Sequence, residues 1–316
     1  MPEHPRFVWF DGAVVPWDDA KVHVSTAAVL RGANVFEGVR AYWNADDHEL
    51  YIFRNADHLA RLRRSAKVMR MAVPWTDAEL TQAELDVLRA NRFQETVWFR
   101  LTLYVGEGEE STWPPDRVPV GGFILPRPAP RSAAVTEGVD SCVSTWIRVA
   151  DLSMPPRVKA GANYHNSRLA WMEARLNGYS GQPLLLDGRG KVSEGPGASF
   201  MMVRRGILVT PPVTSSILES ITRETVLELA RSVLRIPVEE REIDRSEVYV
   251  AEEAFFCGTG AEITPITSLD RYPIGDGRPG PVTRRLQDLY FAVVEGRVPE
   301  YRHWLTPVYR LAGRPA

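Results

Sequence analysis

Two segments in the second half of the chain place a lysine and a glutamate among prolines and glycines. Lys159 follows Pro155-Pro156, which break regular structure, and precedes Gly161 and a helical pattern. Glu194 stands in a Gly-Pro-Gly loop just before a strand pattern. A lysine amine whose proton can be removed forms Schiff bases, and a carboxylate held near backbone can pair with a buried cation.

Two further segments could bind an anion. Ser220 to Thr222 begin a helical pattern, and a helix N-terminus offers free N–H groups, a positive dipole end and here two hydroxyls. Gly258-Thr259-Gly260 is a tight turn between two strand patterns, and its successive N–H groups can form an anion-binding nest.

Taken singly, each feature has a commoner explanation. A loop lysine or glutamate is usually solvated, a Ser or Thr at a helix start is an ordinary N-cap, and Gly-rich turns close hairpins. Together they supply an amine for a Schiff base, an acid for a ring nitrogen and a phosphate cup. That combination describes a pyridoxal phosphate site.

The strand pattern of residues 97–105 has two distinct faces. Its odd-numbered residues are all apolar and predict a core face, while Trp98, Arg100, Thr102 and Tyr104 share the other face. Trp, Arg and Tyr can line a cleft for an anionic, partly apolar ligand. A face covered by another element or subunit is an equally good interpretation of the strand alone.

The elements that must position these residues predict two α+β domains. We expect a hairpin in residues 9–15 with Asp11-Gly12 as its turn, and strands in residues 35–43 and 49–53. Asn55 is expected to cap one helix, and a Thr76/Glu79 capping box to start another that ends near Arg92.

The domain boundaries follow from composition. Residues 1–125 predict a small α+β domain, and residues 126–134 a Pro-rich linker whose prolines preclude regular pairing. Residues 135–316 predict a larger α+β cofactor-binding domain. It is expected to begin with a strand in residues 141–149 and to contain a helix from Asn166 or Ser167, with Leu169, Met172 and Leu176 on one stripe.

Composition limits the classes of function. The 316 residues are 44% hydrophobic with a net charge of −2, and Lys and Arg are scattered, so we expect no nucleic-acid partner. No apolar run approaches a bilayer span and no signal-peptide pattern is present, so we expect a cytoplasmic protein without a membrane partner. The six histidines lack metal-ligand spacing, so no metal is expected, and the two cysteines predict free thiols.

The chain resembles the branched-chain aminotransferases of the fold type IV pyridoxal phosphate enzymes, nearly from end to end. The matching stretches, in chain order, are WFDGAVVPWDDAKVHV, VFEGVRAY, HLARLRRSAK, KAGANY, SEGPGASF, SITRE and CGTGAEITP. The resemblance implies the two-domain D-amino-acid and branched-chain aminotransferase-like fold, pyridoxal 5′-phosphate as cofactor, and a homodimer or higher homo-oligomer.

The resemblance also implies residue roles. Lys159 resembles the lysine that holds the cofactor and moves the proton between the substrate Cα and the cofactor C4′, and Glu194 the partner of the pyridine nitrogen. The phosphate-binding set would comprise Arg61, Ser220, Ile221, Thr222 and Thr259, while Tyr164, supported by Arg148, would bind the phenolic oxygen. The substrate set would comprise Phe36, Gly38, Trp98, Arg100, Thr259 and Gly260.

The departures from the family pattern concern the substrate. Arg31 replaces the tyrosine of a His-Tyr-Gly run, Trp98 replaces a tyrosine, Arg127 replaces an aromatic residue of the linker, and Ser220 replaces a glycine. If Arg31 and Arg127 face the pocket, the substrate carries an additional anionic or polar group. Otherwise both point to solvent or to acids across a dimer interface.

The expected activity is transfer of an amino group between a branched-chain L-amino acid and a 2-oxo acid such as 2-oxoglutarate. The alternatives are a tailoring enzyme for an unusual, possibly anionic amino acid, a D-amino-acid transaminase, and an aminodeoxychorismate lyase. A catalytically silent ligand sensor on the same scaffold belongs to a different class, and the intact lysine, acid and tyrosine set argues against it.

Overall fold

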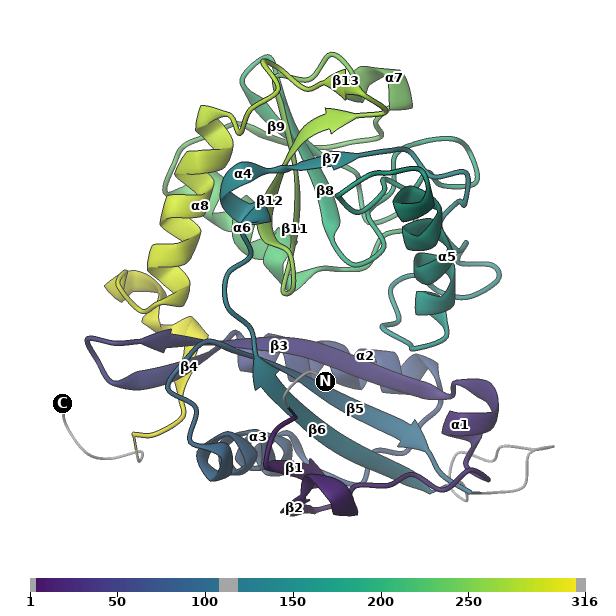
Figure 1. The fold of residues 1–316 in the computed structure, drawn as a ribbon, viewed down its shortest axis with the longest axis vertical. Helices are drawn as coiled ribbons and strands as arrows, with labels where there is room; N and C mark the ends of the chain where they lie inside the picture. Colours follow the sequence, from purple (N-terminus) through teal and green to yellow (C-terminus); the bar gives the residue numbers. More distant parts are fainter. Residues whose placement is uncertain (1–3, 108–118, 311–316) are drawn as a thin grey trace. The chain divides into compact units, whose positions relative to one another are not determined.

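The structure, a computed structural model, describes residues 4–107 and 119–310 and divides into two compact units. The first unit takes its described residues from 1–130, 158–162 and 292–316, and the second unit comprises 131–157 and 163–291. The chain therefore leaves the second unit for five residues around Lys159 and returns to the first unit at its end. Figure 1 shows the course of the chain.

The first unit is built on an antiparallel seven-stranded sheet in its described residues. In sheet order the strands are β14 (Leu305–Pro307), β4 (Glu49–Phe53), β3 (Asn34–Asn44), β5 (Val97–Val105), β6 (Val120–Pro128), β1 (Phe7–Phe10) and β2 (Ala13–Pro16). The expected hairpin is confirmed, since β1 pairs with β2 around Asp11-Gly12, both with positive φ.

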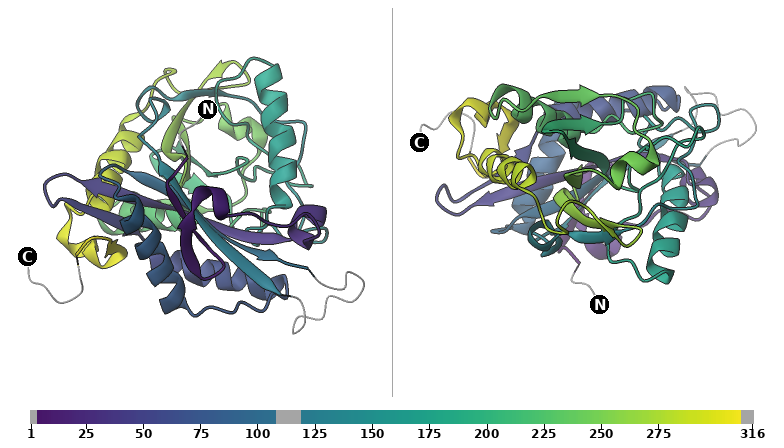
Figure 2. Two further views of the ribbon diagram at one scale, coloured as in Figure 1. Left: turned by 60° about the horizontal axis from the view of Figure 1, so that its bottom comes forward. Right: turned by 90° about the horizontal axis from the view of Figure 1, so that it is seen from above.

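Two long helices, α2 (Asn55–Val68) and α3 (Asp77–Asn91), contact this sheet and each other. Both helices are labelled in Figure 1, and Figure 2 gives two further views. The Thr76/Glu79 capping box of α3 is confirmed. The prediction that Asn55 caps α2 is wrong, because Arg54 occupies the N-cap in a left-handed conformation and the Asn55 amide points at α3 instead. Shorter helical segments are η1 (Trp17–Asp19), α1 (Ala27–Arg31) and η2 (Pro299–Trp304).

The predicted core face of β5 is confirmed, since its odd-numbered residues are buried. On the other face Trp98 and Arg100 are half-buried, whereas Thr102 and Tyr104 are buried as well. The prediction that the prolines after residue 125 preclude pairing is wrong as far as Pro128, because β6 pairs with β5 through that residue. β1 reaches only Phe123 and Ile124, so the later residues of β6 need no N–H donor on that edge.

The second unit contains a second sheet. In sheet order the strands are β10 (Val238–Glu240), β9 (Ile207–Thr210), β8 (Ser199–Arg204), β11 (Glu253–Gly258), β12 (Glu262–Leu269) and β13 (Tyr272–Pro273), and β7 (Val139–Ser141) also pairs with β12. Its helices are α4 (Ala134–Glu137), α5 (Asn163–Leu176), α6 (Ile221–Ser232), α7 (Arg245–Val248) and most of α8 (Pro281–Val294).

Two expectations for this unit need correction. The strand expected in residues 141–149 ends at Ser141, because the following residues form only an isolated bridge between Val143 and Leu184. Helix α5 begins at Asn163, and the stripe expected on one of its faces is exposed in the single chain, with Leu176 84% exposed. Among the described residues, no helix is both long enough and apolar enough to span a membrane.

Candidate active site

Lys159 lies on a short extended segment that joins the edge of β3. The Phe36 amide donates to the Lys159 carbonyl at 2.9 Å, and Val35 and Ala160 form an antiparallel bridge. This edge of β3 is open because β4 pairs only with residues 41–44. The backbone of Lys159 is therefore fixed by sheet hydrogen bonds.

Gly161 allows this segment to lie close to β3. A Cβ atom at Gly161 would lie 2.5 Å from Oδ1 of Asn34, and the Gly161 amide donates to the Asn34 carbonyl at 3.2 Å. Any larger residue at this position would force the Asn34 side chain to move. The other side of the segment is held by α2, since Ser65 Oγ accepts from the Lys159 amide at 3.1 Å.

Helix α2 carries four buried polar residues, and three of them, His58, Arg61 and Ser65, lie at spacings of three and four residues and so share one face. Glu37 of β3, fully buried, meets this face. Arg61 Nε donates to Glu37 Oε1 at 2.8 Å and Nη2 to Oε2 at 2.7 Å, and His58 Nδ1 lies 2.7 Å from Oε2.

The electrostatics of this cluster favour an ionised Glu37. Burial raises the Glu37 pKa, but the Arg61 charge and the hydrogen bonds from Arg61 and His58 outweigh it and lower the pKa to about 2. The His58 pKa is lowered, chiefly by burial. The positive charges of Arg61 and Lys159 also lower this pKa, whereas the hydrogen bond and the charge of Glu37 raise it.

The opposite face of β3 and β5 carries the expected substrate residues. Phe36 lies between two cationic groups, with Lys159 Nζ 5.1 Å and Arg100 Cζ 3.5 Å from its ring centroid. Arg100 Nε also donates to Thr102 Oγ1 at 3.2 Å. This face is therefore aromatic and positively charged beside the lysine.

Trp98 packs on Gly38, where a Cβ atom would lie only 3.0 Å from the indole Nε1. Arg127 stacks on the same indole with its Cζ 4.6 Å from the ring and is exposed in the single chain. Arg31 is the exposed last residue of α1. The structure thus brings Arg127 to the Trp98 face, whereas Arg31 lies at the end of α1.

In the second unit, Glu194 is 3% exposed, and its Oε1 accepts from Arg148 Nε at 2.9 Å and from the Leu218 amide at 3.1 Å. Arg148 Nη1 is buried and has no hydrogen-bond acceptor within the described residues. A buried carboxylate held by an arginine and an amide is suited to face a protonated ring nitrogen, and an unsatisfied arginine N–H is suited to a phenolic partner.

The anion-binding features of the sequence are present as local structure. Ser220 is the N-cap of α6, and its Oγ accepts from the Arg223 amide at 3.2 Å, as expected. Ile221 and Thr222 are buried in the first turn. Residues 259–261 connect β11 to β12, and Thr259 is half-buried while Gly260 is exposed.

Tyr164 is the second residue of α5 and half-buried. The donor set of this unit, a helix N-terminus with hydroxyls and a Gly-rich turn, fits a phosphate, and the buried Glu194 fits a pyridinium. The residues present therefore fit pyridoxal phosphate.

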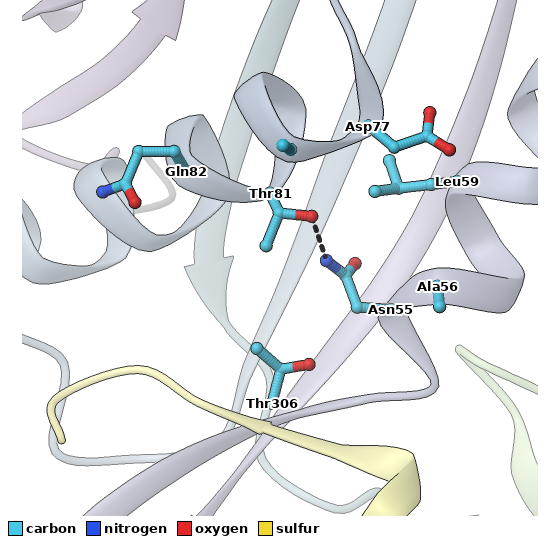
Figure 3. A pocket seen from close by; sticks show the side chains of 8 residues that line it. Asn55, Ala56, Leu59, Asp77, Thr81, Gln82 and Thr306 are labelled. Carbon is cyan, nitrogen blue, oxygen red and sulfur yellow. Dashed lines mark hydrogen bonds between the residues drawn. The ribbon is translucent and has the colours of Figure 1, made fainter. Parts of the chain in front are cut away.

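A pocket of about 410 Å³ lies elsewhere in the first unit, between α2, α3 and β14 (Figure 3). It is lined by Asn55, Ala56, Leu59, Asp77, Ala78, Thr81, Gln82 and Thr306. None of the expected site residues lines it, so we assign the chemistry to the residues described above.

Sequence reasoning missed Glu37, His58 and Ser65. The signal was present in the segment HLARLRRS, where positions 58, 61 and 65 recur at helical spacing. Polar residues on the face that also carries the buried Leu62 indicate a satisfied internal network.

Comparison with known proteins is consistent with this arrangement. The family model described as Amino-transferase class IV matches residues 34–269. A branched-chain-amino-acid aminotransferase from Salmonella typhimurium is 40% identical over 96% of this chain and 97% of its own.

Solved structures of branched-chain aminotransferases have the same fold as this chain. The branched-chain amino acid aminotransferase from Thermobaculum terrenum in its PLP form is 45% identical, with a TM-score of 0.91 over 98% of this chain and 100% of its own. The branched-chain aminotransferase from Thermoproteus uzoniensis with norvaline is 42% identical, with a TM-score of 0.91 over 96% of this chain and 100% of its own.

Proposed function

The chain belongs to the class IV aminotransferases, and on that premise we propose that it is a branched-chain amino acid aminotransferase that uses pyridoxal 5′-phosphate. It transfers an amino group between an L-amino acid and a 2-oxo acid such as 2-oxoglutarate. The observation that carries the proposal is the length of the similarity, which spans every proposed cofactor residue. The same similarity favours this activity over the tailoring, D-amino-acid and lyase alternatives.

Pyridoxal phosphate, when bound, supplies an aldehyde that takes up the amino group and a ring that withdraws electrons from the substrate Cα. In the proposal Lys159 binds the cofactor and then carries a proton from the substrate Cα to the cofactor C4′. Hydrogen bonds to Phe36 and Ser65 hold the backbone of Lys159. The movement is therefore left to the side chain, whose amine can serve both the substrate Cα and the cofactor C4′.

We assign Glu194 to the ring nitrogen, where its carboxylate keeps that nitrogen protonated, and Tyr164 to the phenolic oxygen with Arg148 as its support. Arg61, Ser220, Ile221, Thr222 and Thr259 form the proposed phosphate set. The two hydrogen bonds to Glu194 Oε1 support the first assignment, because they stabilise the ionised form of this buried acid.

The substrate set is Phe36, Gly38, Trp98, Arg100, Gly260, Arg31 and Arg127. Arg100 and Arg127 stack on aromatic rings of the same face, and a guanidinium group is suited to bind a carboxylate. We therefore assign Arg127 to the distal carboxylate of 2-oxoglutarate. Arg127→Leu should raise the KM for 2-oxoglutarate more than the KM for 4-methyl-2-oxopentanoate, whereas an equal change in both would remove Arg127 from the pocket.

We further propose a homodimer in the cytoplasm. Exposed apolar side chains gather on α5 and on the loop that packs along it, namely Trp146, Ile147, Leu169, Met172 and Leu176. A patch of this kind supports burial in an assembly. Sedimentation of the wild type and of Met172→Glu tests it, since a monomeric wild type would contradict the dimer. The free buried thiols of Cys142 and Cys257 support a reducing compartment.

The direct test of function is the visible absorption of the cofactor-loaded protein during titration with L-leucine, L-valine, L-glutamate and D-alanine. Loss of the cofactor band with L-leucine and L-glutamate but not D-alanine is expected. A band that ignores L-leucine and L-valine would contradict the branched-chain assignment. Lys159→Ala should abolish both the band and turnover, whereas Lys67→Ala, an exposed lysine of α2, should leave both unchanged.

A further inference from the structure

Glu37 and Arg61, a member of the proposed cofactor set, form a buried ion pair in the first unit. Both side chains are at least 96% buried, and two N–H groups on one edge of the guanidinium meet the two carboxylate oxygens at 2.8 and 2.7 Å. Such a bidentate pair fixes the plane of the guanidinium as well as its position.

The pair also limits which N–H groups Arg61 can offer elsewhere. Nε and one hydrogen of Nη2 point at Glu37, so a phosphate can be met only by the remaining edge. His58 Nδ1 contacts Oε2 from the preceding turn of α2 and fixes the carboxylate in turn. His58 therefore holds the Glu37 carboxylate independently of Arg61.

The same helix face reaches the lysine. Ser65, one turn after Arg61, accepts the hydrogen bond from the Lys159 amide. On the side of the sheet, the Phe36 amide of β3 donates to the Lys159 carbonyl, and Glu37 is the next residue of β3. The orientation of Arg61 and the position of Lys159 are thus set by one rigid piece of structure.

We propose that Glu37 is a positioning residue for phosphate recognition, which orients the Arg61 guanidinium so that its second edge faces the cofactor phosphate. This inference rests on the proposed function and on the assignment of Arg61 to the phosphate. Its rival is that Glu37 only neutralises a buried arginine during folding. The two roles predict different effects on affinity. Loss of a positioning role weakens only the binding of ligands that carry a phosphate, whereas loss of a folding role weakens the binding of every ligand alike.

The experiment compares the affinity for pyridoxal 5′-phosphate with that for pyridoxal, which lacks the phosphate, by absorption titration of the cofactor-free protein. In Glu37→Gln we expect the ratio of the two affinities to fall about tenfold or more, as is typical when a supporting partner is removed. Binding of pyridoxal should change much less, because pyridoxal has no phosphate for Arg61 to bind. An unchanged ratio would overturn the proposal.

Glu84→Gln is the matched control, because Glu84 is also fully buried near Glu37 but hydrogen-bonds Asn55 rather than Arg61. It should keep the wild-type ratio. Glu37→Asp keeps the charge but is one methylene shorter, so it cannot reach both N–H groups, and its ratio should also fall. If both Glu37 variants are insoluble while Glu84→Gln is soluble, Glu37 acts in folding alone and the proposal fails.

The proposed function fails separately. A wild-type protein that binds neither pyridoxal phosphate nor pyridoxal would refute the aminotransferase assignment itself. A wild type that strongly prefers the phosphorylated form, together with a Glu37→Gln variant that keeps this preference, would refute only the role of Glu37.

Discussion

Glu84 of α3 predicts an unusual dependence of stability on pH. It is fully buried, and desolvation, reinforced by the charge of Glu37, raises its pKa to about 8 although the hydrogen bond from Asn55 acts in the opposite sense. Glu84 Oε1 and Asn55 Oδ1 are both buried without a hydrogen-bond partner in the described residues. A proton on Oε1, donated to Oδ1, would satisfy both atoms.

The expected magnitude follows from linkage. The folded state keeps a proton on Glu84 that the unfolded chain, with an ordinary pKa of 4.5, gives up. Stability from this group is complete below pH 4.5 and is lost as the pH rises toward 8. At about 1.4 kcal/mol per pH unit, Glu84 should lower the free energy of unfolding by about 3 kcal/mol between about pH 5 and pH 7.

Glu84→Gln removes the titration while keeping the shape of the neutral acid. We expect the variant to match the wild type near pH 5 and to exceed its stability increasingly at pH 6, 7 and 8 in urea denaturation. The control is Asp86→Asn, an exposed carboxylate on the same helix, which should keep the wild-type slope. Parallel curves for Glu84→Gln and the wild type would refute a neutral Glu84.

Three further changes test local packing and capping. Gly38→Ala places a Cβ 3.0 Å from the Trp98 indole and should lower stability by about 1 kcal/mol, an effect that Trp98→Ala should relieve in the double variant. Thr76→Ala removes the capping box of α3 and should cost about 1 kcal/mol in urea denaturation, and a cost near zero would contradict it. In Gly280→Ala the new Cβ would collide with Glu253, whose carboxylate accepts hydrogen bonds from the first amides of α8. This variant should therefore lower the melting temperature more than Gly38→Ala or Thr76→Ala does.

Locally encoded features could be predicted from the sequence alone. The Asp11-Gly12 hairpin, the core face of β5, the capping box at Thr76 and the Ser220 cap of α6 are all confirmed. Each depends on contacts between residues a few positions apart, for which backbone preferences and periodicity are sufficient. The combined motifs indicated the cofactor, and the family resemblance added the residue roles, which no single local pattern could separate from commoner alternatives.

Features that depend on distant residues were decided only by the tertiary structure. The prolines of β6 are tolerated because the pairing of β1 with β6 ends at Ile124, which composition cannot reveal. The Lys159 segment could join the first unit only because β4 leaves that edge of β3 open. Sequence separation of more than a hundred residues hides such a pairing from any local pattern.

The sequence determined that a lysine, an arginine and a glutamate are available for chemistry, since their types and order are written in it. The tertiary structure decided that Glu37, in the VFEG stretch, is fully buried against Arg61 rather than solvated. The physical reason is that burial makes a charge costly unless its partner is already in place. Only the packing of α2 on β3 supplies that partner, and with it a fixed direction for the arginine.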